Sequence, residues 1–335
     1  MSPDIRMTTA SRILRADLHV HSWHSTENGD LPFLKSRDCY SDPVAVYRTA
    51  KARGMDIVTI TDHDSIDGCL EVLSRLPDAD DFIIGEEVSC RLPDGDIEVH
   101  LGVYGMTEAL HRDLQPLRKN VFEVIAALRQ AGVFFALNHL LHFYRGQIEL
   151  ESYLRLLAEV PALEVRNGTM VAAHNELVER IVAHLGRSSS GAAARWPVAI
   201  GGSDAHTLRR VGRTWTEATA RTAEEFLSAL KEGLCRPGGE HGGAAAVAGD
   251  AYGVILRYYL SLLGIGPSDH RPLHRAGCLA FSLAALPAQF LPWLIPAFKK
   301  RQELKVVERA SAALTPWLDG HKTRVAWLDM SQEQV

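Results

Sequence analysis

Short apolar segments alternate with helix-like stretches from residue 13 to residue 233, and this alternation constrains the fold more than any other feature. The expected strands lie near residues 13–21, 57–62, 82–88, 97–103, 133–138, 162–166 and 197–202. The expected helices lie at about 42–54, 66–75, 117–130, 149–159, 174–186 and 222–232. Strands that alternate with helices in this way predict an α/β protein with a parallel sheet or a barrel.

Ionisable side chains stand at the end of each expected strand. In the run DLHVH, the alternation of side chains along a strand places Asp17, His19 and His21 on one face. The later strands carry TDHD (61–64), GEE (85–87), EVH (98–100), NH (138–139), EVRN (164–167) and SDAH (203–206). Because the active site of an α/β barrel forms at the carboxyl ends of its strands, we expect these groups to lie together.

These residues are the types that bind metal ions. A single histidine at a strand end is commonly a hydrogen-bonded surface or core residue, and one DHD run could be a helix cap. Seven such groups in one layer would bury unpaired charge at a high cost unless cations neutralised it. The pattern therefore predicts a site for divalent metal ions.

Composition argues against several other classes of protein. The formal net charge of -5 gives no reason to expect tight nonspecific binding to nucleic acid. The five cysteines are scattered and lack C-x-x-C spacing, so a disulfide framework or a structural zinc knuckle is not indicated and a cytoplasmic location is expected. The first sixteen residues lack the apolar core of a secretory signal.

The sequence changes character after residue 235. A Gly- and Ala-rich stretch at 236–249 predicts a linker between a domain at 13–235 and an apolar helical segment at 250–335. The run 276–298 has no charged residue and is long enough to cross a membrane, but Pro287, Pro292 and Pro296 interrupt it. We favour a helical segment that packs on the main domain or on a partner; attachment of 251–298 to a membrane surface, with a location peripheral to the membrane, is the alternative.

The motifs of the first 235 residues resemble those of the PHP (polymerase and histidinol phosphatase) family. The resemblance spans about residues 13–235 and rests on D-x-H-x-H at 17–21, T-D-H-D at 61–64, G-x-E at 85–87, His100, N-H at 138–139 and G-S-D-A-H at 202–206. It implies a distorted (β/α)7 barrel, here with a helical C-terminal extension. It also implies a metal-dependent phosphoesterase.

The resemblance further implies two or three divalent metal ions held by residues at the strand ends. The first metal would be held by His19, His21, Glu87 and Asp204. Glu87 would bridge to a second metal held by His100 and His139, and a third would be held by His63 and His206. Imidazole and carboxylate ligands suit Mn, Fe or Zn better than Mg, which prefers oxygen ligands.

One ligand of the third metal departs from the family pattern. In the family it lies shortly after the H-x-H pair and is usually aspartate or histidine, whereas this chain reads WHSTENGD there. We take Glu27 as this ligand, with His24 and Asp30 as alternatives.

Other residues near the strand ends are assigned supporting roles in catalysis. Asp17 and Asp62 are placed to accept the second N–H of a ligand imidazole and so fix its tautomer. His206 is a weaker candidate for protonating the leaving group, because a histidine bound to a metal cannot also donate. Substrate phosphate is expected to contact polar and basic residues in the nearby loops, namely Arg145, Arg166, Asn167 and Arg209, with Arg210 and Arg213 as further candidates.

The resulting hypothesis is a hydrolase of phosphomonoesters or nucleotide-type phosphodiesters that uses a metal-activated water. Its substrate would be a small phosphorylated molecule or a short nucleic-acid end. Two alternatives stay open: a non-hydrolytic, metal-stabilised module that docks a partner or a membrane through 251–298, and an amidohydrolase-like enzyme that cleaves C–N bonds.

Overall fold

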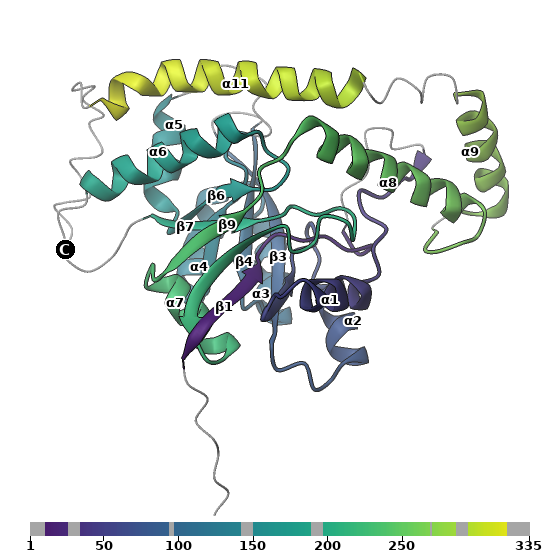
Figure 1. Ribbon diagram of the computed structural model, residues 1–335, viewed down its shortest axis with the longest axis horizontal. Helices are drawn as coiled ribbons and strands as arrows, with labels where there is room; N and C mark the ends of the chain where they lie inside the picture. The colour runs from purple at the N-terminus through teal and green to yellow at the C-terminus, as the bar shows by residue number, and fades with distance from the viewer. Residues whose placement is uncertain are drawn as a thin grey trace, which may run out of the picture.

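A single curved sheet forms the centre of the computed structural model, which describes residues 11–25, 34–93, 97–141, 150–188, 197–268, 270–285 and 294–319 (Figure 1). The strands are β1 (Arg12–Asp17), β2 (Ile57–Ile60), β3 (Phe82–Arg91), β4 (Glu98–Tyr104), β5 (Phe134–Leu137), β6 (Ala162–Asn167), β7 (Val198–Gly202), β8 (Thr214–Ala220) and β9 (Cys235–Gly239). Their order in the sheet is β7-β6-β5-β4-β3-β2-β1-β8-β9.

The two ends of the sheet approach each other and nearly close a barrel. Strand β8 meets β7 through the Thr216 hydroxyl, which accepts from Gly201 N at 2.8 Å and donates to Gly201 O at 2.9 Å. Helices α1 (Pro43–Ala52), α2 (Asp67–Arg75), α4 (Val121–Ala131), α5 (Leu150–Glu159), α6 (Ala172–Ser188) and α7 (Ala223–Lys231) surround the sheet, with the short α3 (Glu108–Leu114) after β4. The predicted distorted α/β barrel is confirmed.

The sheet is mixed rather than wholly parallel. Strand β4 runs antiparallel to both β3 and β5, while β1–β2, β2–β3, β5–β6 and β6–β7 pair in parallel. The physical reason is the length of the connection: residues 92–97 are too few for a crossover, which needs about a dozen residues or more, so β3 and β4 form a hairpin. His100 consequently enters the site from the beginning of its strand.

The stretch expected to be a linker contains regular structure. Residues 235–239 form β9, which pairs antiparallel with β8, and α8 (Ala244–Leu262) begins within the same stretch. Pro237 is compatible with a strand because β9 is the last strand in the sheet order, where a missing N–H breaks no further ladder. Glycine and proline there therefore mark an edge strand and a short turn.

The C-terminal extension consists of α8, α9 (Pro272–Ala284) and α11 (Leu294–Leu318), all lying along one side of the barrel in Figure 1. Leu314 and Trp317 of α11 join the apolar core that also contains Ile181 of α6. Tyr258 and Leu262 of α8 form a smaller apolar cluster with Tyr40. The extension thus shares apolar cores with the barrel.

The apolar run 276–298 lies only partly within the described residues, since 286–293 fall outside them. Within the part of the chain that the structure describes, no helix combines the length and the apolar composition needed to cross a membrane.

Candidate metal centre

Backbone hydrogen bonds join the ends of four strands in two pairs at one mouth of the barrel. His21 N donates to Ala205 O at 3.0 Å, which joins the segment after β1 to the segment after β7. Glu87 N donates to Asp62 O at 3.1 Å, which joins β3 to the segment after β2. Polar side chains from distant parts of the sequence therefore meet at positions that the backbone fixes.

Glu87 lies at the centre of this mouth and is fully buried. Its Oε2 lies 3.0 Å from His19 Nε2 and 3.4 Å from both His21 Nε2 and His63 Nδ1. One carboxylate oxygen therefore faces three imidazoles that come from two different strand ends.

The second oxygen of Glu87 faces a separate pair of imidazoles. Its Oε1 lies 3.2 Å from His100 Nδ1 and 3.0 Å from His139 Nε2. This division of imidazoles between two oxygens suits a carboxylate that bridges two ions. The neighbouring Glu86 instead pairs with His111 at 2.9 Å, so of the two glutamates Glu87 is the one placed in the cluster.

Asp204 completes the first group of ligand-type side chains. Its Oδ1 lies 3.5 Å from His19 Nε2, 3.4 Å from His21 Nε2 and 3.6 Å from His206 Nδ1. Asp204 has a positive φ of 52°, which is uncommon for residues other than glycine. Such strain is typical of functional sites, where the surrounding structure holds a residue in an unfavourable conformation.

Asp38 is a member of the cluster that the sequence analysis missed. One ligand atom from each of His21, Asp38, His63 and His206 lies within 4.8 Å of the others. Glu27, our choice for this position, lies outside the described residues, as does Asp30. His24 pairs with Glu71 at 2.7 Å instead. No spacing rule pointed to Asp38, because tertiary packing brings its loop back to the mouth.

Asp17 and Asp62 accept hydrogen bonds from backbone amides and not from the ligand imidazoles. The expectation that they fix imidazole tautomers is therefore wrong. Asp17 accepts from Ser203 N at 2.8 Å, Gly212 N at 2.6 Å and His19 N at 3.3 Å. Asp62 accepts from the backbone N and the hydroxyl of Ser22 at 2.5 and 2.6 Å. Burial raises the pKa of Asp17 to about 6 and that of Asp62 to about 7, against the effect of these hydrogen bonds.

Glu164 performs the imidazole-orienting role that had been expected of the aspartates. Its Oε1 lies 3.0 Å from His19 Nδ1, and its Oε2 accepts from His139 N at 3.0 Å and from Asn167 Nδ2 at 2.9 Å. A carboxylate on Nδ1 leaves Nε2 of His19 as the nitrogen that points at Glu87 and Asp204. The sequence feature that pointed to this role was the position of Glu164 near the end of the expected strand 162–166, since the other cluster side chains also lie near the ends of expected strands.

Two of the expected substrate contacts are engaged elsewhere. The Arg166 guanidinium pairs with Glu179 at 3.2 Å and donates to Gly239 O at 3.3 Å, because a bulge between Glu164 and Arg166 shifts the strand register. Asn167 is buried, and its amide also donates to Asp204 at 3.3 Å, so it positions cluster side chains.

The remaining arginines differ in how firmly they are held. Arg145 lies outside the described residues. Arg210 and Arg213 pair with Glu240 at 3.2 and 3.4 Å. Arg209 is exposed and lines a cavity next to His206.

The electrostatics of the cluster favour charged carboxylates beside imidazoles. Burial opposes ionisation of Glu87 and Asp204, but the facing imidazoles, His19 above all, outweigh it and hold both pKa values well below the usual range. Burial and the nearby His206 lower the pKa of His21 to about 4, so its ring is neutral at pH 7. A neutral imidazole between two carboxylates is the form that ligates a metal ion.

Buried polar atoms without hydrogen-bond partners are a separate observation that fits binding of divalent cations by these side chains. Nδ1 of His21 and Oδ1 of Asp38 are buried and have no hydrogen-bond partner among the described residues. Leaving such atoms without partners is costly, and a cation in the cluster is one way to satisfy them. Three further groups of three ligand atoms share these residues: His19–His21–Asp204, His19–Glu87–His139 and His63–Glu87–His100.

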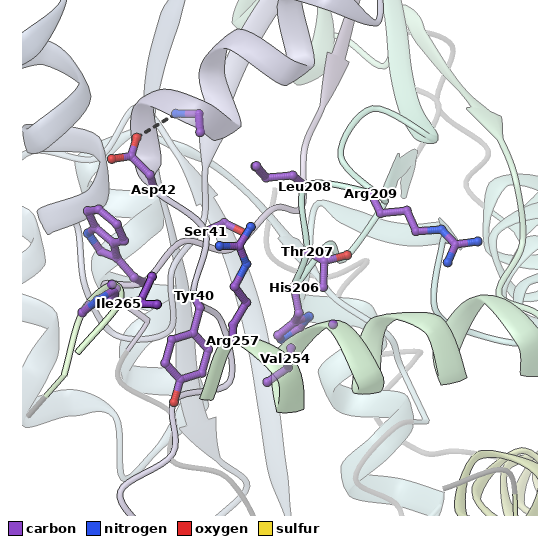
Figure 2. Close-up of a pocket in the computed structure, with 15 residues that line it drawn as sticks. Tyr40, Ser41, Asp42, His206, Thr207, Leu208, Arg209, Val254, Arg257 and Ile265 are labelled. Atoms are coloured by element: carbon purple, nitrogen blue, oxygen red, sulfur yellow. Dashed lines mark hydrogen bonds between the residues drawn. The ribbon is translucent and has the colours of Figure 1, made fainter. Parts of the chain in front are cut away.

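A cavity of about 400 Å³ opens beside the cluster at His206 (Figure 2). Its walls come from the segments after His21 and before α1, from the segment 206–209, and from α8 with the turn that follows it. Its volume is within the usual range for small-molecule sites.

Comparisons with known proteins give one family match and several distant similarities. Residues 174–235 match the family model described as PHP-associated. An uncharacterized protein of Methanocaldococcus jannaschii, MJ1587, is 38% identical over 58 residues, which is 17% of this chain and 33% of that protein. The chain therefore matches only about a third of that relative's length.

Two solved structures resemble the chain at low sequence identity. One, from Bifidobacterium adolescentis, is described as a candidate metal-dependent phosphoesterase; it is 16% identical, with 59% of this chain and 88% of that chain covered and a TM-score of 0.41. The other is the lesion-specific endonuclease EndoQ of Pyrococcus furiosus, 18% identical, with 66% and 56% covered and a TM-score of 0.44.

The matched segment 174–235 contains β7, the end of the barrel that carries Asp204 and His206. It therefore overlaps the G-S-D-A-H motif on which the resemblance partly rests. Over residues 174–235 the family match confirms the resemblance that the motifs predicted, and this segment is similar to the PHP-associated family.

Proposed function

We propose that this protein is a metal-dependent hydrolase of phosphoesters. The observation that carries the proposal is the placement of Glu87, whose two oxygens face two different sets of imidazoles while Asp204 closes the first set. Clusters that share a bridging carboxylate bring two cations close together, and paired cations suit the cleavage of a phosphate ester. Similarity of residues 174–235 to the PHP-associated family supports this class.

The residues that would hold the ions are those of the cluster. They are His19, His21, His63, Glu87, His100, His139, Asp204 and His206, with Asp38 added from the structure. Glu27, expected from the sequence, lies outside the described residues. Divalent cations supply Lewis acidity toward phosphate oxygens and toward water, which these side chains lack by themselves. Mn, Fe or Zn fits a set with this many imidazoles.

The other buried groups keep these ligands in place. Glu164 holds His19 through Nδ1 and so presents Nε2 to the ions. Asp17 and Asp62 fix the backbone next to Asp204 and His21 by accepting from Ser203 and Ser22, and Asp17 also accepts from Gly212. Without these hydrogen bonds the imidazoles would lose the orientation that metal binding requires.

His206 connects the cluster to the cavity where we place the substrate. It is in the group with His21, Asp38 and His63, and it also lines the cavity of about 400 Å³. A phosphate bound at the cluster with its organic part in the cavity would pass His206. Both ring nitrogens of His206 face oxygens of Asp38 and Asp204, which favours a ligand role over transfer of a proton to the leaving group.

The proposal is tested by metal analysis together with hydrolysis of a phosphate-ester panel by the purified full-length protein with Mn²⁺. We expect bound metal and turnover, with both lost in His21→Ala and turnover reduced by about 10³-fold or more in Glu87→Gln. His184→Ala, which changes a histidine packed against Trp317, is the control and should retain both.

Two outcomes would replace the proposal by one of its alternatives. Bound metal with no hydrolysis of any ester would favour the non-hydrolytic module. Cleavage of cyclic amides and of no phosphoester would favour an enzyme that acts on C–N bonds.

A further inference from the structure

Helix α8 of the C-terminal extension is fastened to the segment that directly follows the ligand His206. The Thr207 hydroxyl donates to Asp250 Oδ1 at 2.6 Å, and Arg210 Nε lies 3.7 Å from Asp250 Oδ2. The helix also lies very close: a Cβ added at Gly253 would be 2.9 Å from Thr207 Cγ2. Helix α8 is therefore one wall of the site, at a position fixed relative to His206.

The cavity between α8 and the barrel has an unbalanced positive charge. Arg257 of α8 lines it, and within the described residues the Arg257 guanidinium has no ion-pair partner. Asp42 also lines the cavity, but its carboxylate caps α1 by accepting from Ala45 N at 2.8 Å and pairs with Arg75 at 2.9 Å. The Arg257 cation is thus not neutralised by Asp42, the carboxylate that lines the same cavity.

Figure 2 shows where the two arginines of this cavity lie. The Arg257 side chain extends from α8 toward Ser41, on the side of the helix that faces Thr207 and His206. Arg209 extends away from it along α8, and a Cβ added at Gly249 would lie 2.8 Å from Arg209 Nη1. Arg257 is therefore the better placed of the two to meet a ligand that also reaches His206.

Apart from Ser41 and Thr207, the rest of the lining is aromatic, aliphatic or glycine. Trp23 and Tyr40 come from the barrel side, and Val254, Ile265 and Pro267 come from α8 and the turn after it. A cavity that combines arginine side chains, two aromatic rings and aliphatic side chains suits an anion that carries an apolar or aromatic group.

We propose that α8 makes the substrate pocket of this protein, with Arg257 binding the anionic part of a small phosphoester whose organic group is apolar or aromatic. This inference rests on the proposed function. It adds that the selectivity for substrate comes from the C-terminal extension, whereas the chemistry comes from the barrel. A nucleic-acid end is the competing substrate.

The test compares kinetics of the full-length, Mn²⁺-loaded protein on 4-nitrophenyl phosphate, methyl phosphate and a 5′-phosphorylated oligonucleotide. We expect Arg257→Ala to raise KM for 4-nitrophenyl phosphate about tenfold while kcat changes less than about threefold, because a charged hydrogen bond to bound substrate is lost. Arg257→Lys should recover part of the loss, since it keeps the charge but not the guanidinium fork.

Two further variants separate this role from a general effect on the fold. Arg301→Ala removes an exposed arginine of α11 and should leave KM unchanged. Val254→Trp fills the cavity and should lower kcat/KM for 4-nitrophenyl phosphate relative to methyl phosphate by about tenfold or more. An unchanged KM in Arg257→Ala, or an equal rise in Arg301→Ala, would overturn the inference.

The failure of this inference can be told apart from failure of the proposed function. If the wild type hydrolyses none of the three esters, the proposed function fails. Calorimetric titration with phenylphosphonate then still measures whether Arg257→Ala weakens anion binding about tenfold, as the pocket requires. If the wild type prefers the oligonucleotide, the function stands and the small-substrate pocket is wrong.

Discussion

Individual residues at the mouth of the barrel are divided between ligand-type side chains that face one another and side chains that hold these in place. Four carboxylates that look alike in the sequence have different partners: Glu87 faces imidazoles, Glu164 orients His19, and Asp17 and Asp62 hold backbone amides. Residue type and position predicted that these four carboxylates would be at the mouth. They could not separate these roles, because the partner of each oxygen depends on side-chain packing across strands.

Glu164 provides the first prediction at this scale. Glu164→Gln would weaken the hydrogen bond to His19 Nδ1, so we expect metal affinity to fall by about 10- to 100-fold with the fold retained. Titration of metal-free protein with Mn²⁺ measures this change. Glu179→Gln is the matched control, since Glu179 pairs with Arg166 at the surface. Equal affinities in the two variants would contradict the assigned role of Glu164.

His174 provides a prediction about pH. Burial lowers its pKa below the usual value, and its Nε2 accepts from Leu141 N at 3.4 Å. The folded state therefore binds fewer protons at His174 than the unfolded state, so its contribution to stability is present above pH about 6.5 and is lost as the pH falls below that value.

The measurement for His174 is urea unfolding at pH 7.5 and pH 5.5. We expect His174→Gln to lose less free energy of unfolding between the two pH values than the wild type does. His184→Gln changes a partly exposed histidine that packs against Trp317 and should follow the wild type. A parallel pH dependence in the wild type and His174→Gln would refute this explanation.

At the scale of helices and strands, local signals located most elements and failed where pairing depends on the rest of the chain. Helix α1 begins after the predicted cap Asp42, and its cap hydrogen bond to Ala45 N is present. The reversed direction of β4 follows from a short connection, and β8 (TWTEATA) was not predicted at all. Asp38 was missed for a similar reason, since Leu34 and Tyr40 of its loop are held by α8 and α9.

The two glycines of α8 give a prediction at this scale. Gly253→Ala would place a Cβ 2.9 Å from the branched side chain of Thr207, so α8 must move and KM for 4-nitrophenyl phosphate should rise severalfold. Gly249→Ala meets the end of the flexible Arg209 side chain, which can move aside, and it gains up to about 1 kcal/mol of helix propensity. We therefore expect Gly249→Ala to unfold at a higher temperature than Gly253→Ala, which thermal unfolding checks.

At the scale of the whole molecule, stability and ion binding are coupled. The cluster ties together the segments after β1, β2 and β7 with residues of β3 and β4, so its charges act on most of the barrel at once. A ligand that binds only the folded state stabilises it by about 4 kcal/mol at 1,000 times its Kd.

Removal of the ions provides the prediction at this scale. Treatment with a chelator should lower the unfolding temperature by several degrees, and added Mn²⁺ should restore it. The His21→Ala variant should show a much smaller response in the same thermal scan. An unfolding temperature that does not respond to chelator or to Mn²⁺ would show that the cluster binds no cation strongly.

The hydrogen bond between Thr207 and Asp250 of α8 bears on how substrate selectivity can change among proteins with this barrel. The barrel and its extension meet next to His206 and again where α11 packs on α6, so residues of the extension that face the cavity can change while those contacts are kept. On this proposal, a relative with the same barrel and a different C-terminal extension would catalyse the same reaction on different substrates. Exchanging C-terminal extensions between such relatives is thus a route to altered selectivity that leaves the ion-binding residues untouched.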